Sequence, residues 1–86
     1  MALTLEQVQE AGAILSVAES VRAAAAQLRA RFPGISASVV DAFDMKDETP
    51  AVKTAKGAIY LMENEGHCWS LTADPARASA FVLTGA

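Results

Sequence analysis

The side chains best suited to chemistry lie next to one another in this sequence. His67 and Cys68, the only histidine and the only cysteine, are adjacent, and the only tryptophan follows as Trp69. An imidazole and a thiol can bind a metal ion, or act as the base and the nucleophile of a catalytic pair. A structural zinc site takes four such ligands, typically in close-spaced pairs. Cysteine and histidine alone therefore cannot complete such a site within one chain.

Backbone geometry separates the two side chains further. We expect a strand over residues 67–73, and successive residues of a strand point to opposite faces. His67 and Cys68 then share neither a metal ion nor a proton, unless a bulge re-aims one of them. The sequence also has no glycine-rich phosphate loop, nucleophile elbow or zinc-protease motif. It predicts no catalytic residues, no enzyme activity and no cofactor.

A group of carboxylates is the second candidate for chemistry. Its members within eight residues are Asp41, Asp44, Asp47 and Glu48. Hard cations take such oxygen ligands, but the D-x-D-x-D-G spacing of a calcium loop is absent, which favours solvated loop charge. Two chains would double the ligand count. The alternative function is therefore a metal- or cluster-handling carrier that uses Cys68 across a dimer, with His67, Asp44 or Asp47 as further ligands.

Length and charge limit what can position these residues. The chain has 86 residues and a net charge of −3, which predicts a single domain over residues 1–86 and does not suit a nucleic-acid partner. One cysteine cannot form an internal disulfide. Neither a secretory leader nor an apolar run of about 20 residues occurs, so we expect a cytoplasmic protein without a membrane partner.

The first third of the chain predicts a helix. Thr4 and Gln7 fit a capping box, and Pro33 with Gly34 ends the segment. Apolar residues between them recur at intervals of three and four: Val8, Ala11, Leu15, Ala18, Val21, Ala25, Leu28 and Phe32.

The pattern is compatible with one helix or with two. The unbroken stripe favours one helix. A helix that is bent or split near residues 12–16 is the alternative, because Gly12 weakens a helix and Ser16 with Glu19 fits a second capping box.

Strand patterns follow the helix. Residues 35–43, 57–63 and 67–73 alternate as strands, and Phe81, Val82 and Leu83 read as a fourth. Residues 44–56 lose the apolar pattern and predict a loop, and Asp74 with Pro75 predicts a single helical turn. The predicted fold class is α+β, with the helix packed on one face of a small three- to four-stranded antiparallel sheet.

The expected hairpin determines which side chains share a face. A three-residue turn at residues 64–66 would pair Glu63 with His67. The face toward the helix would then carry Ile59, Leu61, Trp69 and Leu71. The other face would carry Tyr60, Met62 and Cys68, with Val40 from the first strand beside them. One helix layer covers one face, so this second face is predicted either to dock a partner or to be covered by the C-terminal segment.

Three stretches carry a family resemblance: LRARFPG, FDMKDETP and AIYLMENEGHCWSLTADPARASAFVL. They resemble a small family of uncharacterised proteins encoded in bacterial nitrogen-fixation gene clusters. The resemblance spans roughly residues 28–83 and departs at ISASVV, where the family has an aromatic-bearing stretch. It implies an accessory role around nitrogenase and no known catalytic residues.

The function predicted from these observations is that of a non-catalytic accessory or interaction protein linked to nitrogen fixation. Its partner is a nitrogenase-related protein or a second copy of the chain, as in a homodimer. The predicted partner-binding residues are Tyr60, Met62, Cys68 and Val40, because tyrosine and methionine are enriched at protein interfaces.

Overall fold

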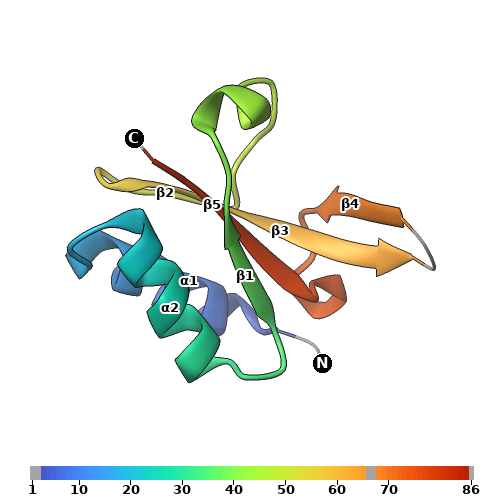
Figure 1. Cartoon of the computed structure of the whole chain (residues 1–86). Coiled ribbons are helices and arrows are strands. Elements are labelled where there is room, and N and C mark those ends of the chain that lie inside the picture. The colour runs from blue at the N-terminus through green and yellow to red at the C-terminus, as the bar shows by residue number, and fades with distance from the viewer. Residues whose placement is uncertain (1–2, 66–67, 86) are drawn as a thin grey trace.

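The computed structural model describes residues 3–65 and 68–85, without the side chains of Glu65 and Cys68 (Figure 1). His67 lies outside the described residues. The elements in chain order are α1 Leu5–Val17, α2 Val21–Arg31, β1 Ser36–Val39, the 3₁₀ turn η1 Ala42–Met45, β2 Val52–Lys53, β3 Gly57–Glu65, β4 Cys68–Thr72, the 3₁₀ turn η2 Pro75–Arg77 and β5 Ala80–Gly85. The α+β class and the helix-first order are confirmed.

The sheet is larger than predicted and is mixed. Its order is β1-β5-β3-β2, and β4 also pairs with β3. The pairs that involve β3 are antiparallel, but β1 runs parallel to β5. The purely antiparallel sheet is therefore wrong. The reason is that β1 and β5 are entered from the same end, where the Ser36 N–H donates to the Ser79 carbonyl oxygen at 3.4 Å.

Two helices form in place of the single helix that the stripe favours. The break lies at residues 18–20, several residues after the expected 12–16. The Ser20 hydroxyl caps α2 by accepting from the Ala23 N–H at 3.1 Å, whereas the Ser16 hydroxyl donates to the Gly12 carbonyl within α1. At the end of α1, Lys56 Nζ donates to the Ala18 carbonyl oxygen at 2.7 Å, which satisfies a backbone acceptor that the helix leaves unpaired.

Gly12 has a packing role in α1. A Cβ atom at this position would lie 2.6 Å from Val52 Cγ1, closer than carbon atoms approach. The missing side chain therefore lets α1 lie close against β2, and Gly12 does not mark the helix break.

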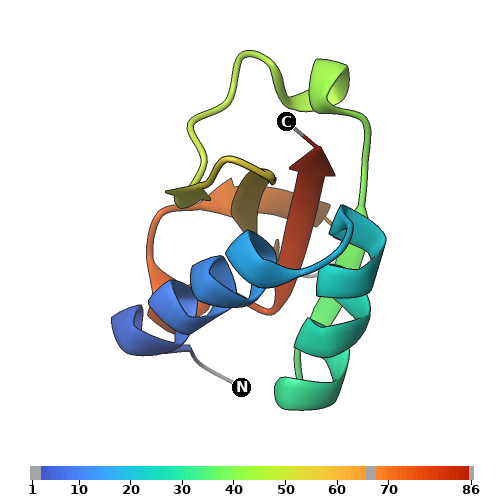
Figure 2. The same ribbon diagram turned by 90° about the vertical axis from the view of Figure 1, so that its left-hand side faces the viewer.

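Both helices pack on the same face of the sheet, and the stripe forms the core between them. Figure 2 shows α2 running beside β1 while α1 crosses the strands. The largest fully buried side chains are Phe81, Leu15, Leu28, Ile59, Leu61 and Leu83. The helices pack mainly against β1, β2, β3 and β5, so β4 extends beyond the layer that they cover.

The pairing of β3 with β4 differs from the expected hairpin. The prediction places Trp69 opposite Leu61, but Thr72 lies there, three residues further along the chain. The predicted Glu63–His67 pair is therefore wrong, and Glu63 lies opposite Ser70. Because the displacement is odd, it turns the side chains of residues 69–72 to the other face of the sheet.

The predicted strand over residues 35–43 ends early. The Asp41 side chain accepts from the Phe43 N–H at 2.9 Å and turns the chain into η1. Phe43 therefore lies outside the strand predicted for it and is 69% exposed. In Figure 1, η1 lies on the side of the sheet opposite to α1 and α2.

The cap of α2 provides a test of the two-helix architecture. Replacing Ser20 with Ala should lower the free energy of unfolding by about 1 kcal/mol, because the Ala23 N–H loses its acceptor. Ser16→Ala is the matched control and should change it by less than about 0.5 kcal/mol. Urea unfolding followed by circular dichroism measures both. Equal losses in the two variants would contradict a cap at Ser20.

Candidate functional site

The observed register assembles an apolar surface on the sheet face away from the helices. Met62 lies opposite Leu71 in β4 and opposite Ala80 in β5, so these side chains share a face. Trp69 lies two residues before Leu71 and points the same way. Tryptophan and leucine, which the sequence assigned to the helix side, are therefore on the open side.

One half of this face is covered by the segment around η1. The Tyr60 side chain is 6% exposed, and its hydroxyl donates to the Met45 carbonyl oxygen at 3.3 Å. Ala58 and Thr84, its neighbours on this face, are also buried. The cover comes from the chain between β1 and β2, and not from the C-terminal segment, which forms β5 within the sheet. Tyr60 is thus removed from the exposed surface that the sequence predicted for it.

The other half is open and forms a groove of about 330 Å³. The groove is lined by Ser36, Ser38, Val40, Met62, Trp69, Ala80 and Val82. Its most prominent apolar side chain is Trp69, which is 52% exposed. An exposed indole beside methionine and valine is the kind of surface that a protein partner covers.

Two of the four predicted partner-binding residues, Val40 and Met62, line this groove together. Cys68 begins β4 with its backbone opposite Glu65, and its side chain lies outside the described residues. Trp69 and Val82 were missed. The alternation of residues in β5 could have indicated that Val82 lies on this face. The face on which Trp69 lies depends on the β3–β4 register, and the residues at the turn predicted a different register.

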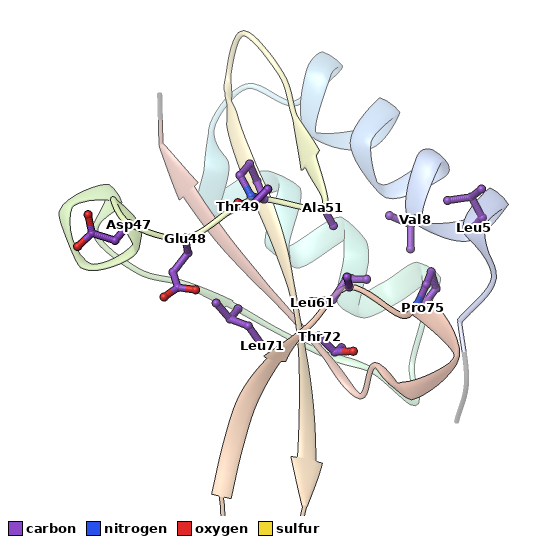
Figure 3. Close-up of a pocket in the computed structure, with 12 residues that line it drawn as sticks. Leu5, Val8, Asp47, Glu48, Thr49, Ala51, Leu61, Leu71, Thr72 and Pro75 are labelled. Atoms are coloured by element: carbon purple, nitrogen blue, oxygen red, sulfur yellow. The ribbon is translucent and has the colours of Figure 1, made fainter.

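A second cavity, of about 510 Å³, lies at the edge of the sheet between the loop before β2, the start of α1 and β4 (Figure 3). Leu5, Val8 and Leu61 supply apolar surface from α1 and β3. Asp47 and Glu48 border it, but Figure 3 shows the Asp47 carboxylate directed away from the apolar side chains. Among the described residues that line it, none is a histidine, cysteine or lysine that could serve as nucleophile or base.

The predicted metal ligands are not brought together where the structure describes them. Asp44 lies in η1 and Asp47 follows it, on the segment that covers Tyr60. Within residues 3–65 and 68–85, no group of three or more histidine, cysteine, aspartate or glutamate side chains is arranged to hold a metal ion. With His67 and the Cys68 side chain outside that set, the metal-carrier alternative stays a prediction.

Glu63 is the one buried carboxylate among the described side chains of the sheet. It lies on the helix side of β3, and Arg77 Nη2 in η2 donates to its Oε1 at 2.7 Å, with Nε at 3.2 Å. The arginine stays more than half exposed. This pair ties η2 to the end of β3 and gives Glu63 a structural role.

Comparison with family models, with curated proteins and with solved structures gave no match. The resemblance to proteins of nitrogen-fixation gene clusters therefore stays a prediction. None of the helices in the described residues is long and apolar enough to cross a membrane.

The contact between Tyr60 and Met45 tests how η1 is held over the sheet. Tyr60→Phe keeps the buried ring but removes the hydroxyl, at a cost of about 0.5–1.5 kcal/mol. We expect the amides of Lys46 and Glu48, which donate within this segment, to exchange with solvent about two- to tenfold faster. Amides of β5 should keep their exchange rates. Unchanged exchange at Lys46 and Glu48 would show that the hydroxyl does not hold η1.

Proposed function

We propose that this chain is a non-catalytic accessory protein that docks a protein partner, or a second copy of itself, through the groove lined by Met62 and Trp69. The observation that carries the proposal is the exposed indole of Trp69 on an apolar face that η1 leaves uncovered. The resemblance stated above supports a cytoplasmic role beside a nitrogenase-related protein.

The shape and composition of the groove support docking over chemistry. Its floor is formed by strands, which hold Met62 and Val82 in fixed positions, and its polar groups are the hydroxyls of Ser36 and Ser38. Among the described residues that line it, none is ionisable. Such a surface recognises apolar side chains by burial, and its described lining offers no ionisable group to act as an acid or a base.

The binding free energy expected at this groove is that of a small interface, in which one or two apolar side chains contribute most of the affinity. A tryptophan that is half exposed and neighbours a methionine can lose most of its remaining exposed area to a partner. Interface tryptophans are typically among the few residues that each cost about 2 kcal/mol or more when truncated. The groove is thus large enough to anchor one or two apolar side chains of a partner.

The test is a charge in the middle of the groove. Met62→Lys should reduce the recovery of the bound partner, or of untagged copies of the chain, at least about tenfold, because association would bury an unpaired ammonium group. Tagged protein is isolated from its native cells grown under nitrogen-fixing, anoxic conditions, and co-purifying proteins are quantified by mass spectrometry.

Val17→Lys is the matched control, because Val17 is 81% exposed at the end of α1, on the helix side of the sheet. It should recover the same proteins as the unaltered chain. Circular dichroism and thermal unfolding verify that both variants fold. Equal recovery by the unaltered chain and by Met62→Lys, or capture of nothing by either, would contradict docking through this groove.

A further inference from the structure

Strand β1 forms an outer edge of the sheet, and its backbone is open on that side. In the order β1-β5-β3-β2, β1 has β5 on one side only. The Ser36 and Val40 N–H groups donate toward β5, to Ser79 and Leu83, at 3.4 and 2.9 Å. Because backbone groups alternate between the two edges of a strand, those of Ala37 and Val39 point outward.

The outward groups have almost no partners in the described part of the chain. The exception is the Ala37 carbonyl oxygen, which accepts from Arg29 Nε of α2 at 3.0 Å. No described backbone acceptor takes the outward N–H groups of Ala37 and Val39. An edge of this kind can pair with another strand.

Two arginines border this edge from the helix layer. Arg22 and Arg29 are seven residues apart, two turns of α2, and therefore lie on the same side of that helix. Together with Ala25 and Val39 they line a groove of about 220 Å³ between α2 and β1. Val39 is 38% exposed there, so the groove reaches the strand edge.

The charge of the groove is not neutralised by the described residues. Arg31, the next arginine of α2, forms an ion pair with Glu10 of α1. No such pair involves Arg22 or Arg29 among residues 3–65 and 68–85. A chain with a net charge of −3 thus presents a local cationic groove beside open backbone donors.

We propose that the edge of β1 binds an extended, acidic segment of a partner protein, added to the sheet as a further strand. The N–H groups of Ala37 and Val39 donate to the backbone of that segment. Side chains on one face of an added strand point to the helix layer, and carboxylates at these positions pair with Arg22 and Arg29. This surface uses the outward backbone groups of β1, whereas the groove at Trp69 uses the side chains of Ser36, Ser38 and Val40 on the open face of the sheet. The inference does not depend on the role proposed for that groove.

Charge argues against a second copy of the chain at this edge. Two β1 strands paired side by side would bring Arg22 and Arg29 of both chains toward the same seam. Arginines that approach one another without counter-charges oppose association. Carboxylates, in contrast, are attracted by the positive charge of Arg22 and Arg29. The occupant that fits is therefore acidic, and the strand geometry requires that it be extended.

The test uses an alternating Glu–Val heptapeptide as the probe and the nitrogen-15 labelled chain, followed by NMR at low ionic strength. We expect the largest shifts at the amides of Ala37 and Val39. Arg22→Gln should weaken binding about two- to fivefold, because it removes one partly exposed ion pair with the peptide. Arg31→Gln, on the same helix but paired with Glu10, should leave the affinity unchanged.

Peptide variants separate strand addition from simple charge attraction. Methylating one alternate set of peptide amide nitrogens should abolish binding, and methylating the other set should be tolerated, because only one set faces β1. The matching Lys–Val peptide should not bind.

Three results would overturn the proposal. The Glu–Val peptide would fail to shift the amides of Ala37 and Val39, Arg31→Gln would weaken binding as much as Arg22→Gln, or binding would be insensitive to both methylation patterns. Concentration-dependent shifts at this edge without peptide would overturn it in favour of a second copy.

Discussion

Strand β3 contributes backbone hydrogen bonds to three other strands, and this sharing determines where the exposed apolar surface lies. Its first part pairs with β5 on one edge and with β2 on the other, and its last part pairs with β4. Side chains alternate along the strand, so Ile59 and Leu61 enter the core while Tyr60 and Met62 face the opposite side. The register of each partner against β3 then fixes the face to which that partner's residues belong.

The two sides of the sheet are stabilised differently as a consequence. The helix side is filled by the apolar stripe of α1 and α2, and its one buried carboxylate among the described residues, Glu63, is paired with Arg77. The opposite side has only η1 among the described elements, a single turn that reaches Tyr60 through the Met45 carbonyl. One short turn cannot cover a five-stranded sheet, and the groove at Trp69 is the part that stays open.

Much of the fold follows from local sequence signals, and the errors have physical causes. The Thr4–Gln7 capping box, the buried stripe and the Asp74–Pro75 turn all form as predicted, because each depends on residues close together in the chain. The helix break was misplaced because a stripe of apolar residues is also compatible with two short helices, and the Ser20 cap is a weak signal within it.

The β3–β4 register could not be obtained in the same way. The residues at 64–66 fit a common three-residue turn, but β3 continues through Glu65. The pattern placed Trp69 toward a helix layer, yet the helices pack mainly against other strands, so burial does not draw it to that side. The candidate groove could therefore be predicted for Val40 and Met62, whose faces follow from their own strands, but not for Trp69.

The nuclear Overhauser contacts of the single tryptophan report directly on the register between β3 and β4. Its indole protons should show cross-peaks to the methyl group of Met62, which lines the groove with Trp69 and lies opposite Leu71, two residues along β4 on the same face. A register with Trp69 on the helix side would instead give cross-peaks to Leu61 and Phe81, in the core. The first result supports a groove built on β3 and β4, and the second would contradict both the register and the docking surface derived from it.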